Sequence, residues 1–303
     1  MFCAAATLVA AASPARADEP IFGFTYTTDL LPQGKSEVEQ WLTWRRQKAH
    51  GDFNLWEGRS EFSYGVTDAF QLSGYLNYDW TQAFHNAVNR TTEPPAPFSD
   101  VIADPNAHFD RARFIGGSVE GIWRVLSPYI DPIGLAFYLQ PTIGENFREL
   151  QSRVILQEDF LDDRLIVAAN LTWQPDIRLL PANPSAPPGT TLASPNTDVK
   201  TAVNWSTGLS YRFAPNLSFA WEFDNERVMN GWAIFARSHW TDSAYYTGPT
   251  LHYGGEHFFA TLTAFEQLPF AKDYANAGVL FQGRDFGVNF EKFRFRFRLG
   301  YYF

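Results

Sequence analysis

Apolar and polar residues alternate with a period of two along most of the chain. In Phe70–Trp80 (FQLSGYLNYDW), Phe, Leu, Tyr and Trp residues occupy one side and Gln71, Ser73, Asn77 and Asp79 the other. The same separation occurs in three further segments, Trp56–Tyr64, Leu165–Gln174 and Leu217–Glu226. Because successive side chains of a β-strand point to opposite faces, these segments predict strands with one apolar and one polar face. They run to about a dozen residues, closer to the roughly 9 to 11 of a transmembrane strand than to the usual 5 to 6.

Short turns and longer connections alternate between the strands. The short turns are predicted at Val66–Ala69, Ser127–Pro132, Asp162–Asp163, Ala214–Asn216 and Gly254–Glu256. The longer, mostly polar connections are predicted at His85–Ala112, Leu179–Val199, Asn230–Thr241 and Leu268–Asp285, while His50–Asp52 is short. Short turns at one end and long loops at the other are typical of outer-membrane barrels. The pattern predicts an all-β, transmembrane antiparallel up-and-down β-barrel of about 12 strands, with 14 possible because Phe22–Thr27 is also strand-like.

The last strand alternates strictly between aromatic or aliphatic residues and arginine. Its apolar side comprises Phe293, Phe295, Phe297, Leu299, Tyr301 and Phe303, and its basic side Arg294, Arg296 and Arg298. In a soluble protein such an apolar strand would invite aggregation. A lipid bilayer would cover the apolar side, and a lumen with water and carboxylates would accommodate the arginines.

The end of the chain resembles that of Gram-negative outer-membrane β-barrel proteins, whose last strand carries alternating apolar residues, an aromatic residue near the end and a final Phe. Leu299, Tyr301 and Phe303 match this pattern. Val66–Tyr78 (VTDAFQLSGYLNY) and Leu126–Tyr138 (LSPYIDPIGLAFY) are similar to segments of an uncharacterised porin-like or transporter-like family of this class. The resemblance implies location in the bacterial outer membrane, contact with outer-membrane lipid and lipopolysaccharide, and insertion by the barrel-assembly machinery, with the three matching residues as the assembly signal.

The beginning of the chain reads as an export signal. Met1–Ala17 combines an apolar stretch of signal-peptide length with an Ala-x-Ala pattern before Asp18. Cys3, the only cysteine, lies in this stretch, so the exported protein would contain no disulfide. We therefore expect a signal peptide at 1–17, an N-terminal periplasmic or plug segment at 18–35 and the barrel at 36–303.

Charge and hydropathy exclude two classes of protein. The net charge is −9 at pH 7, which becomes −10 once the single charge of Arg16 is removed with the signal. This acidic balance, without a basic cluster outside the last strand, argues against a nucleic-acid partner. Beyond the signal, no apolar run approaches the roughly 20 residues that a spanning helix needs, which excludes a helical membrane protein.

The polar faces of the strands supply the candidate functional residues. If the alternation is read correctly, the lumen is lined by Glu57, Arg59, Glu61, Glu120, Arg124, Glu222, Asp224, Glu226, Arg294, Arg296 and Arg298. These charges could neutralise one another and fill a structural barrel, because barrels of about 8 strands are packed solid while those of about 16 hold a wide channel. They could also line a narrow pore for small solutes, since rings of charged side chains set ion selectivity. The narrow pore is the predicted function, with an unknown solute.

A lipid hydrolase or deacylase is the enzymatic alternative. Ser238 and His239 are the candidate pair, but adjacent residues on a strand point to opposite faces and no supporting acid follows the pattern. We therefore expect no catalytic site. His85, His108 and Asp110 share an acidic connection without diagnostic ligand spacing, so we expect neither a metal nor a cofactor.

Overall fold

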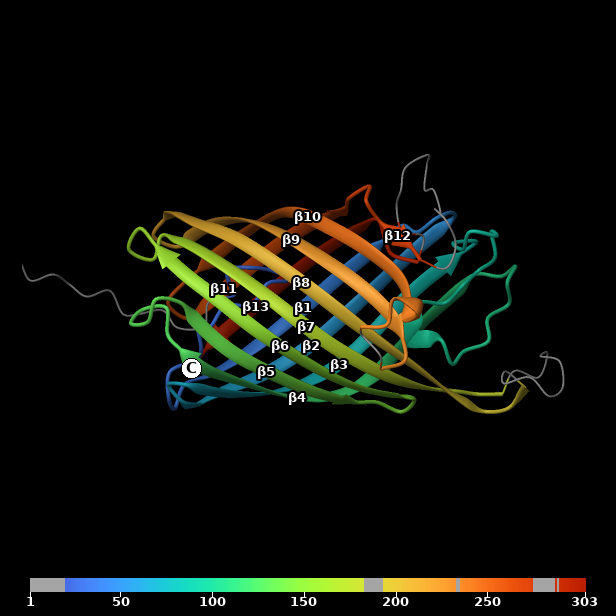
Figure 1. Cartoon of the computed structure of the whole chain (residues 1–303), viewed down its shortest axis with the longest axis horizontal. Coiled ribbons are helices and arrows are strands. Elements are labelled where there is room, and N and C mark those ends of the chain that lie inside the picture. The colour runs from blue at the N-terminus through green and yellow to red at the C-terminus, as the bar shows by residue number, and fades with distance from the viewer. Residues whose placement is uncertain (1–19, 183–192, 233–234, 275–286, 288) are drawn as a thin grey trace, which may run out of the picture.

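The chain forms a closed β-barrel in the computed structural model, which describes residues 20–182, 193–232, 235–274, 287 and 289–303. The predicted signal segment, Met1–Ala17, lies outside these residues. The long strands are β1 (Ser36–Arg46), β2 (Asp52–Thr67), β3 (Phe70–Phe84), β4 (Phe109–Leu126), β5 (Gly134–Ile143), β6 (Phe147–Phe160), β7 (Leu165–Leu180), β8 (Asn196–Ala214), β9 (Leu217–Asn230), β10 (Trp240–Gly254), β11 (Phe258–Gln267) and β13 (Phe293–Tyr302). All are antiparallel to their neighbours and tilted against the barrel axis (Figure 1).

The barrel closes between the first and last long strands. Strand β13 pairs with β11 on one side and with β1 on the other, where Tyr302 lies opposite Glu37. A two-residue strand, β12 (Lys272–Asp273), adds to the end of β10. Among the described residues, twelve strands therefore form the wall, as predicted. The alternative of 14 strands is wrong, because Phe22–Thr27 forms no strand and instead bonds to side chains of the wall.

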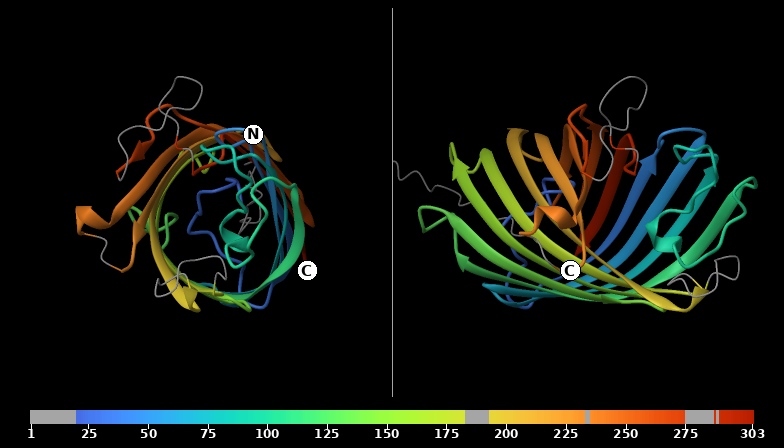
Figure 2. Two further views of the ribbon diagram at one scale, coloured as in Figure 1. Left: turned by 90° about the vertical axis from the view of Figure 1, so that its right-hand side faces the viewer. Right: turned by 45° about the vertical axis from the view of Figure 1, so that its right-hand side comes forward.

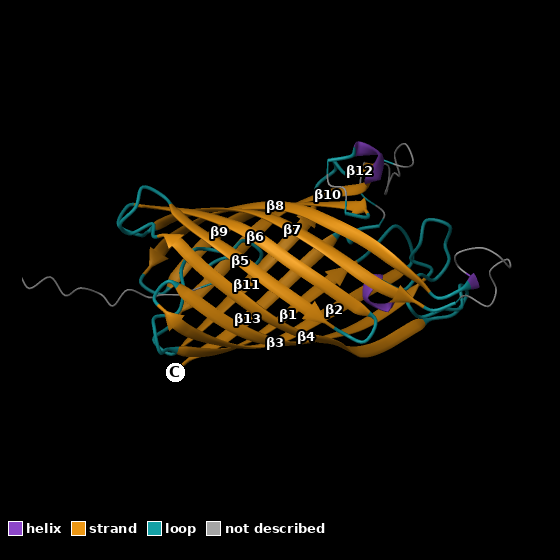
Figure 3. Ribbon diagram, turned by 60° about the horizontal axis from the view of Figure 1, so that its bottom comes forward, coloured by secondary structure: helices purple, strands orange, loops and turns teal. Residues whose placement is uncertain are grey.

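The two ends of the barrel differ. The turn end carries short connections at 68–69, 127–133, 161–164, 215–216 and 255–257, together with Phe303 (Figures 1 and 3). The loop end carries the longer connections, which include the short 3-10 helices η1 (Ala96–Phe98) and η3 (Arg237–His239). Two connections at the loop end are nevertheless short, 47–51 and 144–146. The predicted alternation of short and long fails at 144–146, because the Gly144 N–H donates to the Phe147 carbonyl at 2.9 Å and closes a tight hairpin.

The distribution of side chains is the reverse of that in a soluble protein. Large apolar residues on the outward faces are exposed, with Phe62 at 53% and Leu76 at 57%. Polar and charged residues on the inward faces are buried, with Glu120 at 2% and Glu222 at 0%. An apolar belt around a polar interior is the arrangement of transmembrane β-barrels. In the described parts of the chain, no helix is long and apolar enough to cross a membrane.

The residues before β1 enter the barrel. We call Pro20–Gln33 the inner segment; it forms a loop inside the ring of strands in the end-on view (Figure 2). Phe22 is fully buried, and Leu30 packs in a cluster with Ile122 and Ile155 from the wall. The lumen of this barrel is thus partly occupied by its own chain. The division of the chain at residues 18 and 36 stays a prediction.

Candidate functional site: the lumen and its mouth

A single carboxylate on β9 holds the inner segment by its backbone. The Glu222 carboxylate accepts hydrogen bonds from the N–H groups of Gly23, Phe24 and Thr25 at 2.8, 2.9 and 2.8 Å. It also accepts the Thr250 hydroxyl at 2.6 Å. Within the described residues no Lys or Arg side chain forms an ion pair with Glu222. Three consecutive amides therefore take the place of a cation, as in backbone anion nests.

Amide side chains of the wall continue this attachment. Asn170 on β7 accepts the Tyr26 N–H at 2.7 Å and returns a bond to the Tyr26 carbonyl at 2.9 Å. Gln157 on β6 accepts the Thr28 N–H at 2.6 Å. The inner segment is not part of any ladder, so these side chains satisfy backbone groups that would otherwise be buried without partners. Its position depends on residues more than a hundred positions away in sequence.

Apolar contacts fix the register of the inner segment. Phe24 stacks on Phe265 of β11 with ring centroids 4.5 Å apart. A Cβ atom added to Gly208 of β8 would lie 2.4 Å from the Phe22 ring, so only glycine leaves room for that ring. Tyr26 packs edge-on against Tyr138 at 5.4 Å.

Toward the loop end, charged side chains form a tightly paired network around Arg294. Arg294 is 1% exposed and contacts Glu226 at 2.5 Å and Asp224 at 3.3 Å. It also pairs with Glu291, which in turn accepts a bond from Arg45 at 2.8 Å. Charge-assisted bonds of this kind stabilise only when every partner is present, because removing one leaves the others buried without a counter-ion. We call these residues the Arg294 network.

Nearer the turn end, Arg298 lies in a region that holds several carboxylates. Arg298 binds Glu39 through two hydrogen bonds of 2.5 and 2.8 Å and lies 3.9 Å from the centroid of the Trp41 ring. Glu61 accepts the Ser63 hydroxyl at 2.7 Å, and Glu120 accepts the Tyr75 hydroxyl at 2.6 Å. The arginine thus binds Glu39, whereas neutral hydroxyl donors bind Glu61 and Glu120.

The remaining candidate arginines belong neither to the Arg294 network nor to the contacts around Arg298. Arg296 donates to the Thr43 hydroxyl at 2.8 Å and to the Gly23 carbonyl at 2.9 Å, so it supports the inner segment. Arg59 lies 5.8 Å from the Trp41 ring centroid. Arg124 donates to the Asp68 carbonyl at 2.7 Å, at the turn end.

The structure groups the predicted residues differently from a simple ring of charges. Asp224, Glu226 and Arg294 come together, whereas Glu57 pairs at 2.6 Å with Arg45, which the sequence analysis did not select. Glu39 and Glu291 were also missed. Glu39 and Arg45 share one face of β1 with Trp41 and Thr43, so the same period of two would have found both. Whether these residues line a conducting path stays a prediction.

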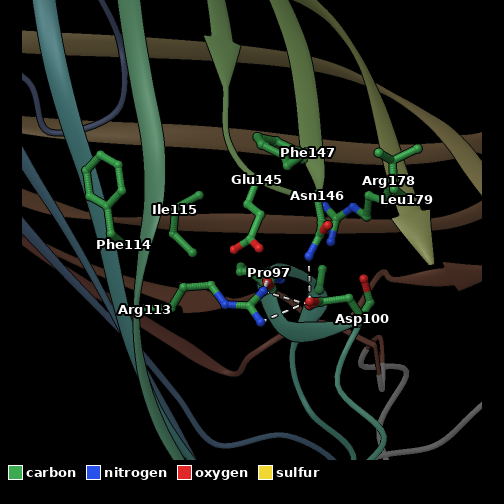
Figure 4. Close-up of a pocket in the computed structure, with 12 residues that line it drawn as sticks. Pro97, Asp100, Arg113, Phe114, Ile115, Glu145, Asn146, Phe147, Arg178 and Leu179 are labelled. Carbon is green, nitrogen blue, oxygen red and sulfur yellow. Dashed lines mark hydrogen bonds and ion pairs between the residues drawn. The ribbon is translucent and has the colours of Figure 1, made fainter. Parts of the chain in front are cut away.

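A pocket lies at the mouth of the barrel, where the connection 85–108 meets the strand ends (Figure 4). Arg113 of β4 binds Asp100 of this connection through bonds of 2.7 and 3.0 Å, and Asn146 donates to the same carboxylate at 2.8 Å. Burial works to raise the pKa of Asp100, but the hydrogen bonds and charge of Arg113 outweigh it and hold the pKa below the ordinary value. Glu145 points toward this pair in the close-up view (Figure 4). The ion pair between Arg113 and Asp100 thus attaches this connection to the rim of the barrel.

The other candidate residues at the loop end make separate contacts. Ser238 and His239 lie in η3, and His239 Nδ1 is 2.9 Å from the Asn230 carbonyl oxygen. The rings of His85 and His108 stack on Phe84, with centroids 3.9 and 3.8 Å away. Among the described residues, no group of three or more His, Cys, Asp or Glu is placed to hold a metal ion.

Residues 14–303 match the model of a family described as a family of unknown function, DUF6662. The chain belongs to this family. No curated protein matches the sequence.

Solved structures show which fold this DUF6662 protein shares. The COG4313 outer-membrane channel from Pseudomonas putida F1 aligns with a TM-score of 0.57 at 11% identity, covering 91% of this chain and 98% of that one. The β-domain of the Bordetella autotransporter BrkA aligns with a TM-score of 0.50 at 9% identity, covering 89% of this chain and 100% of that one. At such identities the likeness concerns the fold, which is that of porin-like outer-membrane barrels, as the resemblance of the chain end predicted.

Proposed function

We propose that this DUF6662 protein resides in the bacterial outer membrane and provides a narrow passage for small solutes, with the inner segment as its constriction. The apolar outer face and the polar interior support the membrane location. The turn end, which carries Phe303, would then face the periplasm. The fold shared with an outer-membrane channel supports passage rather than catalysis, and we propose no enzymatic activity.

The observation that carries this proposal is how the inner segment is held. The side chains of Phe22, Phe24 and Leu30 pack against apolar residues of the wall. Its backbone is attached by hydrogen bonds to Glu222, Asn170 and Gln157. Water can replace such bonds at little enthalpic cost, because a bridging water is nearly as good as a direct bond. A segment attached in this way can shift and still remain solvated, which suits a constriction in an aqueous path.

A structural barrel with a filled lumen is the second candidate. The Arg294 network favours it, because Arg294 is almost fully buried and its guanidinium nitrogens are all engaged by carboxylates, so none is free to meet a passing anion. In that case the inner segment and the network together would act as a permanent plug.

Conductance of the purified protein in a planar lipid bilayer tests the proposal. A channel gives discrete current steps, and joint replacement of Arg294, Arg296 and Arg298 by Gln should move its reversal potential toward cations, since fixed charge sets the local ion concentration. A filled barrel gives no current in the wild type, and the same replacement lowers stability or creates a leak. Heat-modifiable migration in detergent serves as the folding control for each variant.

The proposed assembly route has a separate test. We propose that the barrel-assembly machinery recognises Leu299, Tyr301 and Phe303, whose side chains point outward and are exposed. Phe303→Ser should reduce the amount of protein in the outer-membrane fraction more than it lowers the heat stability of the molecules that fold. Leu262→Ser, an outward substitution on β11, is the control. Equal membrane levels for wild type and Phe303→Ser would refute the role of the terminal residue.

A further inference from the structure

A cavity lies between the inner segment and the wall formed by β1 to β4. Carboxylates dominate its lining, which includes Asp29, Glu37, Glu39, Glu61 and Glu120. Arg298 is the one cationic side chain among the lining residues. We call this space the carboxylate cavity.

The single arginine does not balance these acids. Both guanidinium bonds of Arg298 to carboxylate go to Glu39, at 2.5 and 2.8 Å. Within the part of the chain that the structure describes, neither Glu61 nor Glu120 forms an ion pair, and their bonds come from the Ser63 and Tyr75 hydroxyls. Arg59 and Arg153 lie nearby, at the Trp41 and Tyr26 rings, but neither forms an ion pair with these two acids in the described residues. A buried carboxylate without a direct counter-charge is unfavourable, so Glu61 and Glu120 favour a cationic partner.

Two buried polar atoms that line the carboxylate cavity have no hydrogen-bond partner among the described residues. The Thr25 hydroxyl oxygen has no hydrogen-bond partner among the described residues, although Thr25 is only 3% exposed. Glu61 Oε2 is also without a partner in this part of the chain, and Glu61 is 7% exposed. Both residues line the carboxylate cavity. Buried polar atoms usually have a partner, so two in one cavity indicate a place for a bound group.

The contacts of Arg298 indicate which class of ligand the carboxylate cavity can bind. Arg298 places a planar cation 3.9 Å from the Trp41 ring centroid and binds a carboxylate with two parallel bonds. Tyr26 and Tyr75 add further aromatic rings to the lining. A bare metal ion fits less well, because no group of three acidic or histidine side chains among the described residues is arranged to hold one.

We propose that the carboxylate cavity binds a small organic cation that carries an ammonium or guanidinium group. The cation donates hydrogen bonds to Glu61 and Glu120, and its remaining polar atoms meet the Thr25 hydroxyl. This inference goes beyond the proposed function, because an equilibrium site in the lumen does not depend on whether the lumen conducts.

Isothermal titration of the full-length barrel in detergent tests the site, with methylguanidinium and 1,4-diaminobutane as probes. We expect saturable binding to the wild type and at least tenfold weaker binding to the double variant E61Q/E120Q. Glu149→Gln is the matched control, because Glu149 bonds to Gln174 at 2.7 Å outside the cavity lining. Its binding should equal that of the wild type.

A second variant keeps the test informative if the double variant fails to fold. Thr25→Val removes the hydroxyl without changing charge, and it should weaken binding several-fold. Absence of saturable binding to the wild type, or equal binding to the wild type and E61Q/E120Q, would overturn the proposal. Binding of Ca²⁺ but of neither amine would overturn the ligand class. These results are independent of conductance, so the site and the channel can fail separately.

Discussion

In two regions of the same lumen, acidic side chains are bound by different kinds of donor. In the Arg294 network, Asp224, Glu226 and Glu291 all face one buried guanidinium. Around the inner segment, Glu222 accepts bonds from backbone amides and one oxygen of Glu61 accepts a bond from a hydroxyl. Charges of opposite sign that touch hold each other in place, whereas amide and hydroxyl donors add no positive charge to offset the carboxylates. We therefore expect the contacts of the first region to stay in place and those of the second to exchange with solvent or a ligand.

The largest effect is expected when the Glu222 attachment is removed. Glu222→Ala leaves three amides of the inner segment without an acceptor, each costing about 1 to 3 kcal/mol if it stays dry. The inner segment should therefore leave its place and admit water. Conductance in a planar bilayer should rise several-fold over the wild type, and Glu222→Gln, which keeps one acceptor oxygen, should rise less. Identical currents for the wild type and Glu222→Ala would show that Glu222 does not control the constriction.

A loss of stability, rather than an opening, is expected from the Arg294 network. Arg294→Met leaves three buried carboxylates without their shared cation, at a cost of about 3 to 5 kcal/mol. The temperature at which migration in detergent changes should fall markedly. Arg164→Met is the control, because Arg164 is exposed and bonds to the Tyr211 hydroxyl at the surface. If both variants lose stability equally, the network is not a special source of rigidity.

A larger side chain at position 208, which would crowd the inner segment, should have an effect of intermediate size. Gly208→Val places methyl groups where the Phe22 ring lies, and overpacking of this kind costs about 1 to 3 kcal/mol. Gly74→Val is the matched control, because a Cβ atom at Gly74 meets nothing within 4 Å. Protease sensitivity of the inner segment should increase for the first variant and stay at the wild-type level for the second. Equal sensitivity of the two variants would contradict the close approach of Phe22 to β8.

The smallest effect concerns the ion pair at the mouth. The pKa of Asp100 is held below its ordinary value, so the pair stabilises the protein above about pH 4 and this contribution is lost as the pH falls through the lowered pKa. A partly exposed pair contributes about 1 kcal/mol or less. Asp100→Asn should therefore lower the unfolding temperature slightly at pH 7 and leave it unchanged once the pH is below the lowered pKa of Asp100. A difference that persists at low pH would show that the Asp100 charge is not its source.

The sequence was sufficient for the wall and insufficient for what it encloses. Period-two alternation identified the outward and inward sides of β3, β9 and β13, because a strand offers only two faces and here the outward one is apolar. The short hairpin at 144–146 was missed, although the three residues Gly144, Glu145 and Asn146 between two strand-like runs are a hairpin signal. The placement of the inner segment depends on Glu222 and Asn170, which are far away in sequence and are recognisable only once the barrel is closed.

The pairing of β1 with β13 restricts the order of folding. Glu37 and Tyr302 become neighbours only when the whole wall is present, and the loop-closure entropy of joining such distant residues makes this a late event. The inner segment directly precedes β1, but the side chains that bind its backbone come from β6, β7 and β9. Its binding site is therefore complete only after these distant strands have joined the wall. We therefore expect the N-terminal part of the barrel to be completed last, although it is the first part of the described chain to be synthesised.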